Sequence, residues 1–462
     1  MKGITKLSAT ALAVLTLSGC DWFDGDDNTT ETVTPPPPPS STFVRVHHTS
    51  ADAPDVNVLV NGAAALEAVP YQTSSGVLEL DAGDYEIQVD GILPGGDVAT
   101  VIGPADLSFA ADTRYEIFAV GKVGDESIAP LILENAVTPV TDGNVRVQVV
   151  HAAPDAPDVD VYVTAPDAAL ADETAVGTLA FGDNTAQLEV PTGDYQIRVT
   201  VAGDPAAVAF DSGTVNLDAG ADLVIAAVEN TAAGESPVVL QVSDGTTTEL
   251  VYDVNSGSNL RVVHASADAP NVDITLNNAA EPAIANLAFG SFAGYVNLAA
   301  DDYLVDVAAA GGDPVVIDDA ELTLELGAQY SVYAIGGLAD LALAVLPESN
   351  RSIATAAQLQ VVHASVSAGN VDIYLTATDD ISEAEPAVGD VPFTIDDLVS
   401  TGNLQVAAGD YVVTVTAAGT KDAAIGPIPV TLEAGGVYTA VAVDANGGGL
   451  PPQLILLDDF VE

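Results

Sequence analysis

The sequence predicts an all-β protein made of four tandem antiparallel β-sandwiches, and three observations support this prediction. A motif centred on a histidine recurs four times along the chain. Segments in which apolar and polar residues alternate surround each copy, and this is the period of a half-buried strand. Turns rich in Gly, Asp and Pro separate these segments, and no segment shows a convincing helical period.

The histidine motif opens each repeat. Its copies occupy residues 149–161 (V-V-H-A-A-P-D-A-P-D-V-D-V), 46–58, 262–274 and, in a degraded form, 361–373. Before the clearest copy, Val145, Val147 and Val149 alternate with polar residues, which predicts a strand with one buried face. Pro157 has a fixed φ and no N–H, so the chain turns there before a second alternating strand.

An aromatic residue follows the second strand in each repeat. It stands within L-A-F-G or a looser V-P-Y/F at residues 179–182, 287–290, 69–71 and 391–393. We expect this ring to plug one end of the core of its own sandwich.

The most regular element is a β-hairpin that contains Asp-Tyr. Its tyrosine is Tyr85, Tyr195, Tyr303 or Tyr411. The pattern favours a buried ring whose hydroxyl bonds the backbone, like the tyrosine corner of β-sandwiches. A second hairpin and a last strand bring each repeat to about seven strands and roughly 100 residues, the size of an immunoglobulin-like or prealbumin-like sandwich.

The N-terminus predicts a bacterial lipoprotein signal. Lys2 and Lys6 give a positive start, residues 7–17 are apolar but too short to span a membrane, and L-S-G-C ends at Cys20. The pattern resembles a signal that is cut before the cysteine, whose thiol is then acylated. Cys20 is the single cysteine, so no disulfide can form within the chain. Residues 21–42, which are acidic and then proline-rich, predict a stiff tether.

The domain boundaries follow the repeats. We expect a signal at 1–20, a tether at 21–42, and sandwiches at 43–140, 141–250, 251–355 and 356–462. The linkers between sandwiches are short and polar, which predicts a string of four domains with restricted bending.

The charge balance is extreme, with 10 Lys and Arg against 67 Asp and Glu and a net charge of −57. Such a surface repels the phosphates of nucleic acid, which is therefore excluded as a partner, and it repels anionic lipid headgroups. Adaptation to a salty medium, where counterions screen self-repulsion, explains the charge most simply. Functional cation binding is the alternative.

The histidines of the motif, His48, His151, His264 and His363, stand at strand ends. One histidine per repeat cannot build a multi-histidine zinc site, and no recurring nucleophile accompanies it. The pattern favours a structural ring that bonds the Asp-Ala-Pro turn, so we assign no catalytic residue.

Acidic residues gather in and after the same turn. They are Asp52, Asp55, Asp155, Asp158, Asp160, Asp268 and Asp273. Calcium takes roughly six to eight oxygen ligands, so these turns are candidate calcium sites, and no other cofactor is expected. Turn formation by Asp and exposure on a strand explain the same residues without a metal.

Together, the V-V-H-A-S-x-D-A-P-x-V-D-V opening, the L-A-F-G element and the G-D-Y hairpin resemble a bacterial domain family of unknown function. The resemblance covers nearly all of residues 43–462. That family occurs, often as tandem copies, in exported and lipid-anchored proteins. The resemblance implies an architecture and a location but no activity.

Two classes of function remain. The first is a non-enzymatic protein of the bacterial cell envelope, periplasmic or surface-exposed, that acts as a spacer, adhesin or binding module. Its expected partners are the membrane, through the lipid anchor, and a protein or polysaccharide of the envelope or the exterior. The alternatives are a polysaccharide hydrolase, which needs a carboxylate pair in a cleft, and a calcium-dependent ligand-binding protein.

Overall fold

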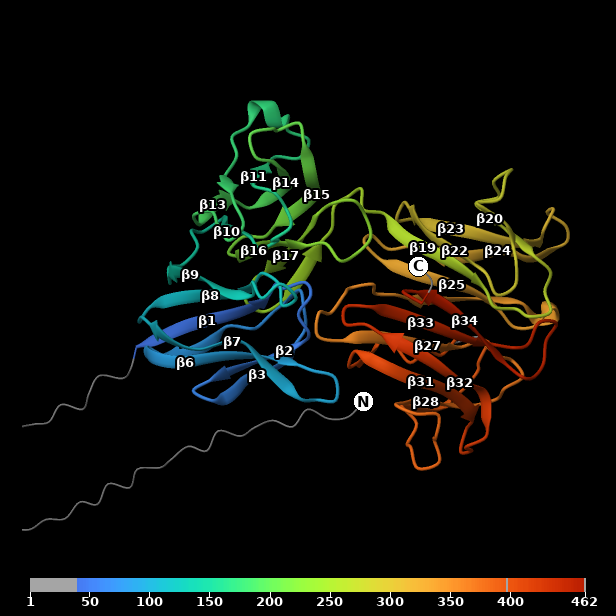
Figure 1. The fold of residues 1–462 in the computed structure, drawn as a ribbon. Helices are drawn as coiled ribbons and strands as arrows, with labels where there is room; N and C mark the ends of the chain where they lie inside the picture. The colour runs from blue at the N-terminus through green and yellow to red at the C-terminus, as the bar shows by residue number, and fades with distance from the viewer. Residues whose placement is uncertain (1–39, 396–397, 461–462) are drawn as a thin grey trace, which may run out of the picture. The chain divides into compact units, whose positions relative to one another are not determined.

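Strands form nearly all the regular structure of the protein (Figure 1). The computed structural model describes residues 40–395 and 398–460, which belong to one compact unit, Ser40–Glu462. Within the described residues the helical elements are two short 3₁₀ turns, η1 (Leu170–Asp172) and η2 (Leu338–Asp340). This confirms the predicted all-β class. The predicted signal, Cys20 and the tether lie outside the described residues.

The strands divide into four sets, one for each repeat. The first repeat contains β1 (Ser41–His48), β2 (Val56–Val60), β3 (Ala63–Val69), β4 (Thr73–Ser74), β5 (Leu78–Asp81), β6 (Gly83–Ile92), β7 (Val98–Phe109), β8 (Thr113–Val120) and β9 (Ala129–Ala136). The second contains β10 (Asn144–His151), β11 (Val159–Thr164), β12 (Gly177–Leu179), β13 (Leu188–Pro191), β14 (Gly193–Val201), β15 (Val208–Leu217), β16 (Asp222–Glu229), β17 (Val238–Ser243) and β18 (Thr248–Val251). The third contains β19 (Ser258–His264), β20 (Val272–Leu276), β21 (Ile284–Leu287), β22 (Phe292–Leu298), β23 (Asp302–Ala309), β24 (Val315–Thr323), β25 (Gln329–Ile335) and β26 (Ala342–Pro347). The fourth contains β27 (Ala357–His363), β28 (Val371–Thr376), β29 (Val388–Val391), β30 (Leu404–Val406), β31 (Gly409–Ala417), β32 (Ala423–Leu432), β33 (Val437–Val443) and β34 (Gln453–Asp458).

Each repeat is a sandwich of two sheets, and the third repeat shows the plan most simply. One sheet has the strand order β22-β19-β25-β26, and the other has the order β21-β20-β23-β24. The strand that carries the motif histidine is β1, β10, β19 or β27, and we call the sheet that contains it the histidine sheet. Apolar side chains from both sheets form a separate core in each repeat.

The histidine sheets are mixed, so the prediction of purely antiparallel sandwiches is corrected. The histidine strand pairs in parallel with the first strand of the closing hairpin, as β1 does with β8 and β10 with β16. The same pairing joins β19 to β25 and β27 to β33. In the third repeat the chain passes to the second sheet for β20 and β21 and returns for the antiparallel edge strand β22. It then crosses to the second sheet again for β23 and β24 before β25 enters beside β19 in the same direction. A parallel neighbour requires such a long crossover.

The central strands of the histidine sheets are buried on both faces. Along β16, Leu223 and Ile225 point into the core of the second repeat. The alternate residues Val224 and Ala226 pack in another cluster with Phe118 of the first repeat. The run of apolar residues in β16 therefore reflects burial on two sides, as in sheets that are covered on both faces.

This packing corrects the prediction of four separate domains in a string. The histidine sheets of the first and second repeats share one apolar cluster, and those of the third and fourth repeats share another, which includes Tyr333 and Val441. The expected strand β10 with one buried face is likewise buried along nearly its whole length, because a neighbouring repeat covers its polar face.

The aromatic residue after the second strand does not plug its own core, as the sequence predicted. Tyr71 belongs to the cluster between the first two repeats, and Phe289 and Phe393 pack against the cluster between the last two. Phe181 is 40% exposed. Three of the four rings thus bury their apolar surface between repeats.

Candidate functional site

The motif histidines bond the turn that follows them, as the sequence predicts. Their Nε2 atoms lie close to carbonyl oxygens six residues ahead: His48 to Pro54 (2.9 Å), His151 to Pro157 (3.0 Å), His264 to Pro270 (3.0 Å) and His363 to Gly369 (2.7 Å). A carbonyl oxygen only accepts, so Nε2 carries the proton in each ring. The bond fixes both the tautomer and the turn.

Burial favours the neutral form of three of these rings, His48, His264 and His363. It lowers the pKa of His48 to about 4, and it lowers the pKa of His264 and His363. The Nδ1 atoms of these three rings are enclosed and have no hydrogen-bond partner within the described residues. A general base must reach its substrate, and these atoms do not reach solvent, so the arrangement favours a structural role.

The predicted tyrosines make a second repeated contact. Each hydroxyl donates to the carbonyl oxygen four residues earlier: Tyr85 to Asp81 (2.8 Å), Tyr195 to Pro191 (2.8 Å), Tyr303 to Ala299 (3.0 Å) and Tyr411 to Ala407 (2.8 Å). The rings are half-buried rather than fully buried as expected.

The structure does not gather the predicted acids into calcium sites. Asp160 accepts hydrogen bonds from Thr178 Oγ1 (2.5 Å) and the Gly203 N–H (2.8 Å), which hold neighbouring strands together. Asp273 accepts the N–H groups of Asn286 (2.7 Å) and Gly311 (2.8 Å) in the same way. These oxygens are already occupied by donors.

The other predicted acids are dispersed. Asp52 accepts the N–H groups of Val123 and Gly124 (2.8 Å each), and Asp268 accepts the N–H of Leu338 (2.8 Å). The remaining members of the set, which accept no bond from their own turn, are Asp55, Asp155 and Asp158; of these, Asp155 pairs with Lys122.

One group of three acids does bring its oxygens within 4.8 Å of one another in the described part of the chain, but none of its members was predicted. It consists of Asp306, Asp318 and Asp319 in the third repeat. Asp306 already accepts the N–H of Asp319 (2.8 Å). The cluster therefore joins the neighbouring strands β23 and β24, and it lies apart from the predicted turns.

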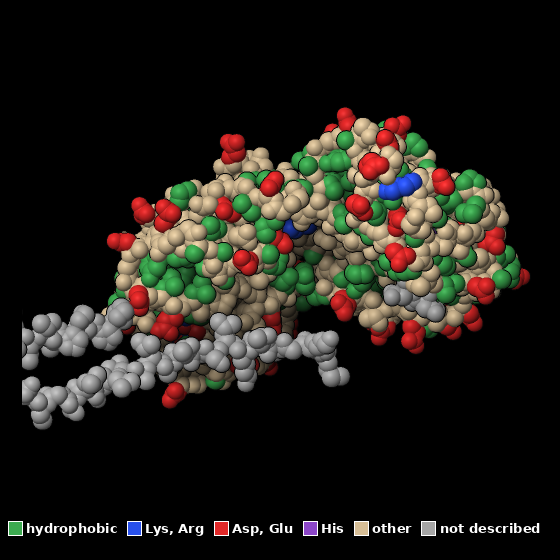
Figure 2. Space-filling model, turned by 90° about the horizontal axis from the view of Figure 1, so that it is seen from below, with side chains coloured by type: hydrophobic (Ala, Val, Ile, Leu, Met, Phe, Trp, Pro, Cys, Tyr) green, Lys and Arg blue, Asp and Glu red, His purple; other side chains and the backbone are tan. Residues whose placement is uncertain are grey.

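The basic residues, which the sequence analysis did not single out, hold the repeats together. Six of the eight Lys and Arg residues that the structure describes contact a neighbouring repeat or linker: Arg45, Arg114, Lys122, Arg146, Arg261 and Arg351. On the face shown in Figure 2, acidic side chains are scattered widely and basic ones are few. In so acidic a chain, this placement puts basic side chains where repeats meet, so that they attract the acidic side chains of the neighbouring repeat.

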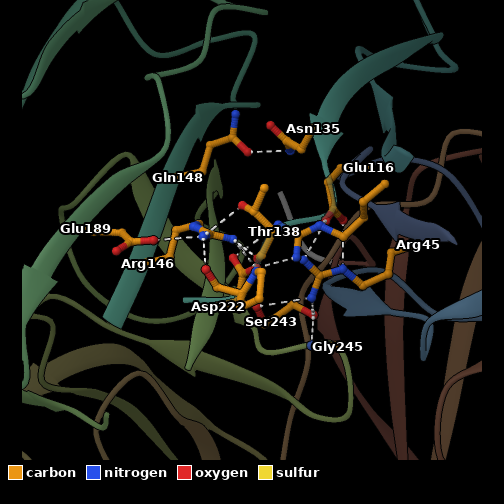
Figure 3. A network of polar contacts seen from close by, with 12 residues as sticks. Arg45, Glu116, Asn135, Thr138, Arg146, Gln148, Glu189, Asp222, Ser243 and Gly245 are labelled. Atoms are coloured by element: carbon orange, nitrogen blue, oxygen red, sulfur yellow. Dashed lines mark hydrogen bonds and ion pairs between the residues drawn. The ribbon is translucent and has the colours of Figure 1, made fainter. Parts of the chain in front are cut away.

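Glu116 lies at the centre of the network between the first two repeats (Figure 3). Its side chain is fully buried and accepts hydrogen bonds from Arg45 Nε (2.8 Å) and Nη2 (2.6 Å) and from His47 Nε2 (2.9 Å). Nε of Arg114 lies 2.9 Å from its Oε1. Burial alone would raise the pKa of Glu116, but the bonds from His47 and Arg45 lower it to about 2.

The network continues into the second repeat. Arg114 pairs with Asp222 (2.5 Å), whose same oxygen lies 3.1 Å from Arg146 Nη1. Arg146 also pairs with Glu189 (2.7 Å). Arg45 reaches Ser243 at the end of β17, with its Nη1 3.4 Å from Oγ. Charged groups from both repeats therefore pair with one another, and at Arg45 and Glu116 they do so out of water, as buried ions require.

The last two repeats are joined by a different arginine. Arg261 is buried and pairs with Asp458 of the fourth repeat, while Glu348 lies 3.6 Å from its Nη2. Burial raises the pKa of Glu348. Farther along, Arg351 of the linker donates to the carbonyl oxygens of Ala51 (3.0 Å) and Ala53 (2.8 Å) in the first repeat.

The sequence carries a signal for this pairing. Arg45 and Arg261 stand three residues before the motif histidine in the first and third repeats, where Gln148 and Gln360 stand in the second and fourth. Gln148 accepts a hydrogen bond from Asn135 across the first interface (2.8 Å, Figure 3). The alternation of arginine and glutamine distinguishes odd from even repeats.

Comparison with known proteins identifies one family of domains. A family model described as "Domain of unknown function (DUF4397)" matches residues 42–162 and 258–374, together just over half of the chain. Each match covers an odd repeat and the first two strands of the next, so the model finds two copies where the fold shows four repeats. No curated protein matches.

The similarity to solved structures is weak. The chain resembles a multi-modular glycogen-degrading pneumococcal virulence factor, SpuA, in its product complex, with 9% identity and a TM-score of 0.16. The match covers 60% of this chain and only 37% of that protein. Among the described residues, no helix has the length and apolar character needed to cross a bilayer.

Proposed function

The chain belongs to the DUF4397 family, which is described only as a domain of unknown function, and we propose that it is a non-enzymatic protein of the bacterial cell envelope. Cys20 carries the lipid that anchors it to a membrane, and the folded repeats act as a spacer, adhesin or binding module, in the periplasm or on the surface. Its partners are the membrane and a protein or polysaccharide of the envelope or the exterior.

The observation that carries this proposal is the placement of the scarce basic residues. The structure describes eight Lys and Arg residues, and six of them contact a neighbouring repeat or linker. The motif histidines likewise bond their own turns. The basic side chains thus hold the repeats together and the histidines hold their own turns, which suits a rigid support.

The experiment compares the full chain with its Cys20→Ser variant in a bacterial host. Labelled fatty acid should be incorporated into the parent chain, which should sediment with the membranes. The variant should take up no label and should remain in the soluble fraction. An unlabelled parent chain, or a labelled variant, would overturn the proposal that a lipid on Cys20 anchors the protein.

A hydrolase is the second candidate, and one pair of acids favours it. Lys122 contacts both Asp155 and Glu229 (3.0 Å to Glu229 Oε1) between the first two repeats. Burial raises the pKa of Glu229, while the hydrogen bond from Lys122 lowers the pKa of Asp155. Carboxyl groups whose pKa values are separated in this way can divide the roles of acid and base.

The two candidates are separated by assaying release of reducing ends from envelope polysaccharides. The non-enzymatic proposal expects no release above that of the Glu229→Gln variant. Release that depends on Glu229 and survives in the control Glu235→Gln, an exposed acid of the same repeat, would establish the hydrolase instead.

A further inference from the structure

The second repeat contains a cleft of about 370 Å³ at one end of its sandwich. Its floor is apolar and includes Leu217, Leu223, Ile225 and Val242, from β15, β16 and β17. Leu217, Leu223 and Ile225 also belong to the core of the repeat, so the cleft opens directly onto that core. A volume of this size lies within the range of roughly 300–1,000 Å³ that small-molecule sites occupy.

The cleft lies where the other repeats place a tyrosine. In the pairing of the histidine strand with its parallel neighbour, Leu223 stands opposite Val147. The matching residues of the first, third and fourth repeats are Tyr115, Tyr330 and Tyr438.

Two of these tyrosines show how a ring closes the end of a sandwich. Tyr115 is 3% exposed, its hydroxyl accepts the N–H of Ala110 (3.0 Å), and its ring centroid lies 4.7 Å from that of Phe109. Tyr438 accepts the N–H of Glu433 (2.9 Å) and packs 4.9 Å from Phe460. Leucine at position 223 has neither the reach nor the hydroxyl of tyrosine, so the second sandwich stays open at this end.

The rim of the cleft is acidic. Asp218, Asp244 and Glu249 line it, and no Lys or Arg does. Hydrogen bonds from the N–H groups of Thr247 and Thr246 lower the pKa of Asp244 to about 2, so this group is ionised at neutral pH. The carboxylates of Asp218 and Glu249 have no hydrogen-bond or ion-pair partner in the described part of the chain and are free to meet a ligand.

We propose that this cleft is a binding site for a small organic cation that carries an aromatic or compact aliphatic group. The apolar group enters between the sheets above Leu217 and Leu223, and the cationic group lies among the carboxylates at the rim. Apolar burial supplies most of the affinity, and the charges select a cation over a neutral or anionic analogue. The inference is independent of the proposed function, because it concerns one repeat only.

The experiment titrates the compact unit, residues 40–462, with 2-phenylethylamine in 150 mM sodium chloride and follows the binding by calorimetry and NMR. Neutral 2-phenylethanol and anionic 3-phenylpropionate serve as comparison probes. We expect saturable binding of the amine, weaker binding of the alcohol and none of the carboxylate. Absence of saturable amine binding, or equal binding of all three probes, would overturn the proposal.

A closing variant places the ring pair of the first repeat into the second. In Leu217→Phe/Leu223→Tyr the new rings take the positions of Phe109 and Tyr115. Amine binding should weaken at least tenfold while the melting temperature does not fall. Unchanged binding by this folded variant would show that the amine binds elsewhere. If the variant fails to fold, the single change Val242→Phe, on the floor of the cleft, repeats the test.

A rim variant separates a specific site from general attraction to an acidic protein. Asp218→Asn/Glu249→Gln should weaken amine binding by roughly threefold to tenfold, as expected for two exposed charges, and should leave 2-phenylethanol binding unchanged. The matched control, Asp172→Asn/Glu235→Gln, removes the same charge from exposed positions outside the cleft and should bind as the parent does. Equal losses in both variants would refute the site.

Discussion

Replacing Glu116 by glutamine should destabilise the first two repeats strongly. Glu116 is fully buried and is the carboxylate that pairs with Arg45, which is itself 1% exposed. Glutamine keeps the shape but not the charge, so the guanidinium of Arg45 stays buried without its counter-charge. Breaking a buried ion pair in this way costs roughly 3–5 kcal/mol. For a cooperative unit of about 200 residues, this corresponds to a fall in melting temperature on the order of 6–20 °C.

The measurement is a thermal melt followed by circular dichroism, with Glu134→Gln as the control. Glu134 is exposed on β9 of the same repeat, so its loss should change stability by no more than about 0.5 kcal/mol. The parent should also lose stability as the pH falls from 4.5 towards 2, because the pKa of Glu116 is lowered in the folded state. Glu116→Gln should show less of this loss. A melt of Glu116→Gln that coincides with that of the control would refute the role of the network.

Three further predictions concern the repeated motif. Burial lowers the pKa of His48 from 6.5 to about 4 in the folded state, so on acidification His48 is protonated in the unfolded chain before it is protonated in the folded one. The melting temperature should therefore fall as the pH is lowered from 6.5 to 4, and the fall should be smaller in His48→Gln. Tyr195→Phe should cost about 0.5–1.5 kcal/mol in chemical denaturation because it removes the bond to Pro191, whereas Tyr162→Phe, whose hydroxyl has no partner among the described residues, should be nearly neutral. Calcium should move the melting temperature by less than about 1 °C relative to chelator at fixed ionic strength, since donors already occupy Asp160 and Asp273; a larger rise would support the calcium sites instead.

The parts of the fold that the sequence predicts correctly are local. The bond from His151 to Pro157 spans six residues, and the bond from Tyr195 to Pro191 spans four. Alternation of apolar residues also identifies the strands, because the buried or exposed face of each side chain is predicted from its neighbours in the sequence. These features repeat with the motif and need no knowledge of distant contacts.

The parts of the fold that local patterns do not predict depend on distant residues. Alternation does not encode strand direction, so the parallel pairing of β10 with β16 was not predicted. The alternation in β10 predicts one buried face and so leaves Arg146 and Gln148 on the other, although the first repeat and its linker cover them. The apolar run of β16 and the alternation of arginine with glutamine were available signals for this burial, and both indicate a second packing face.

The turn acids show how one pattern supports two interpretations. Asp160 and Asp273 have the spacing of oxygen ligands, but in the structure each accepts N–H or hydroxyl donors from neighbouring strands. Which donors reach a carboxylate depends on the register of strands far apart in the sequence. The geometry that decides between the two interpretations is therefore found only in the folded sandwich, and calcium binding at these turns stays a prediction.

The most direct test of the central claim, that the repeats are fastened in pairs, is differential scanning calorimetry of residues 40–462. If the histidine sheets pack as described, two repeats or more should unfold together, and the ratio of calorimetric to van't Hoff enthalpy should be about two or less. Arg114→Met should then lower the transition of the first pair, and Arg261→Met that of the second. A ratio near four, with each repeat unfolding by itself, would contradict the account.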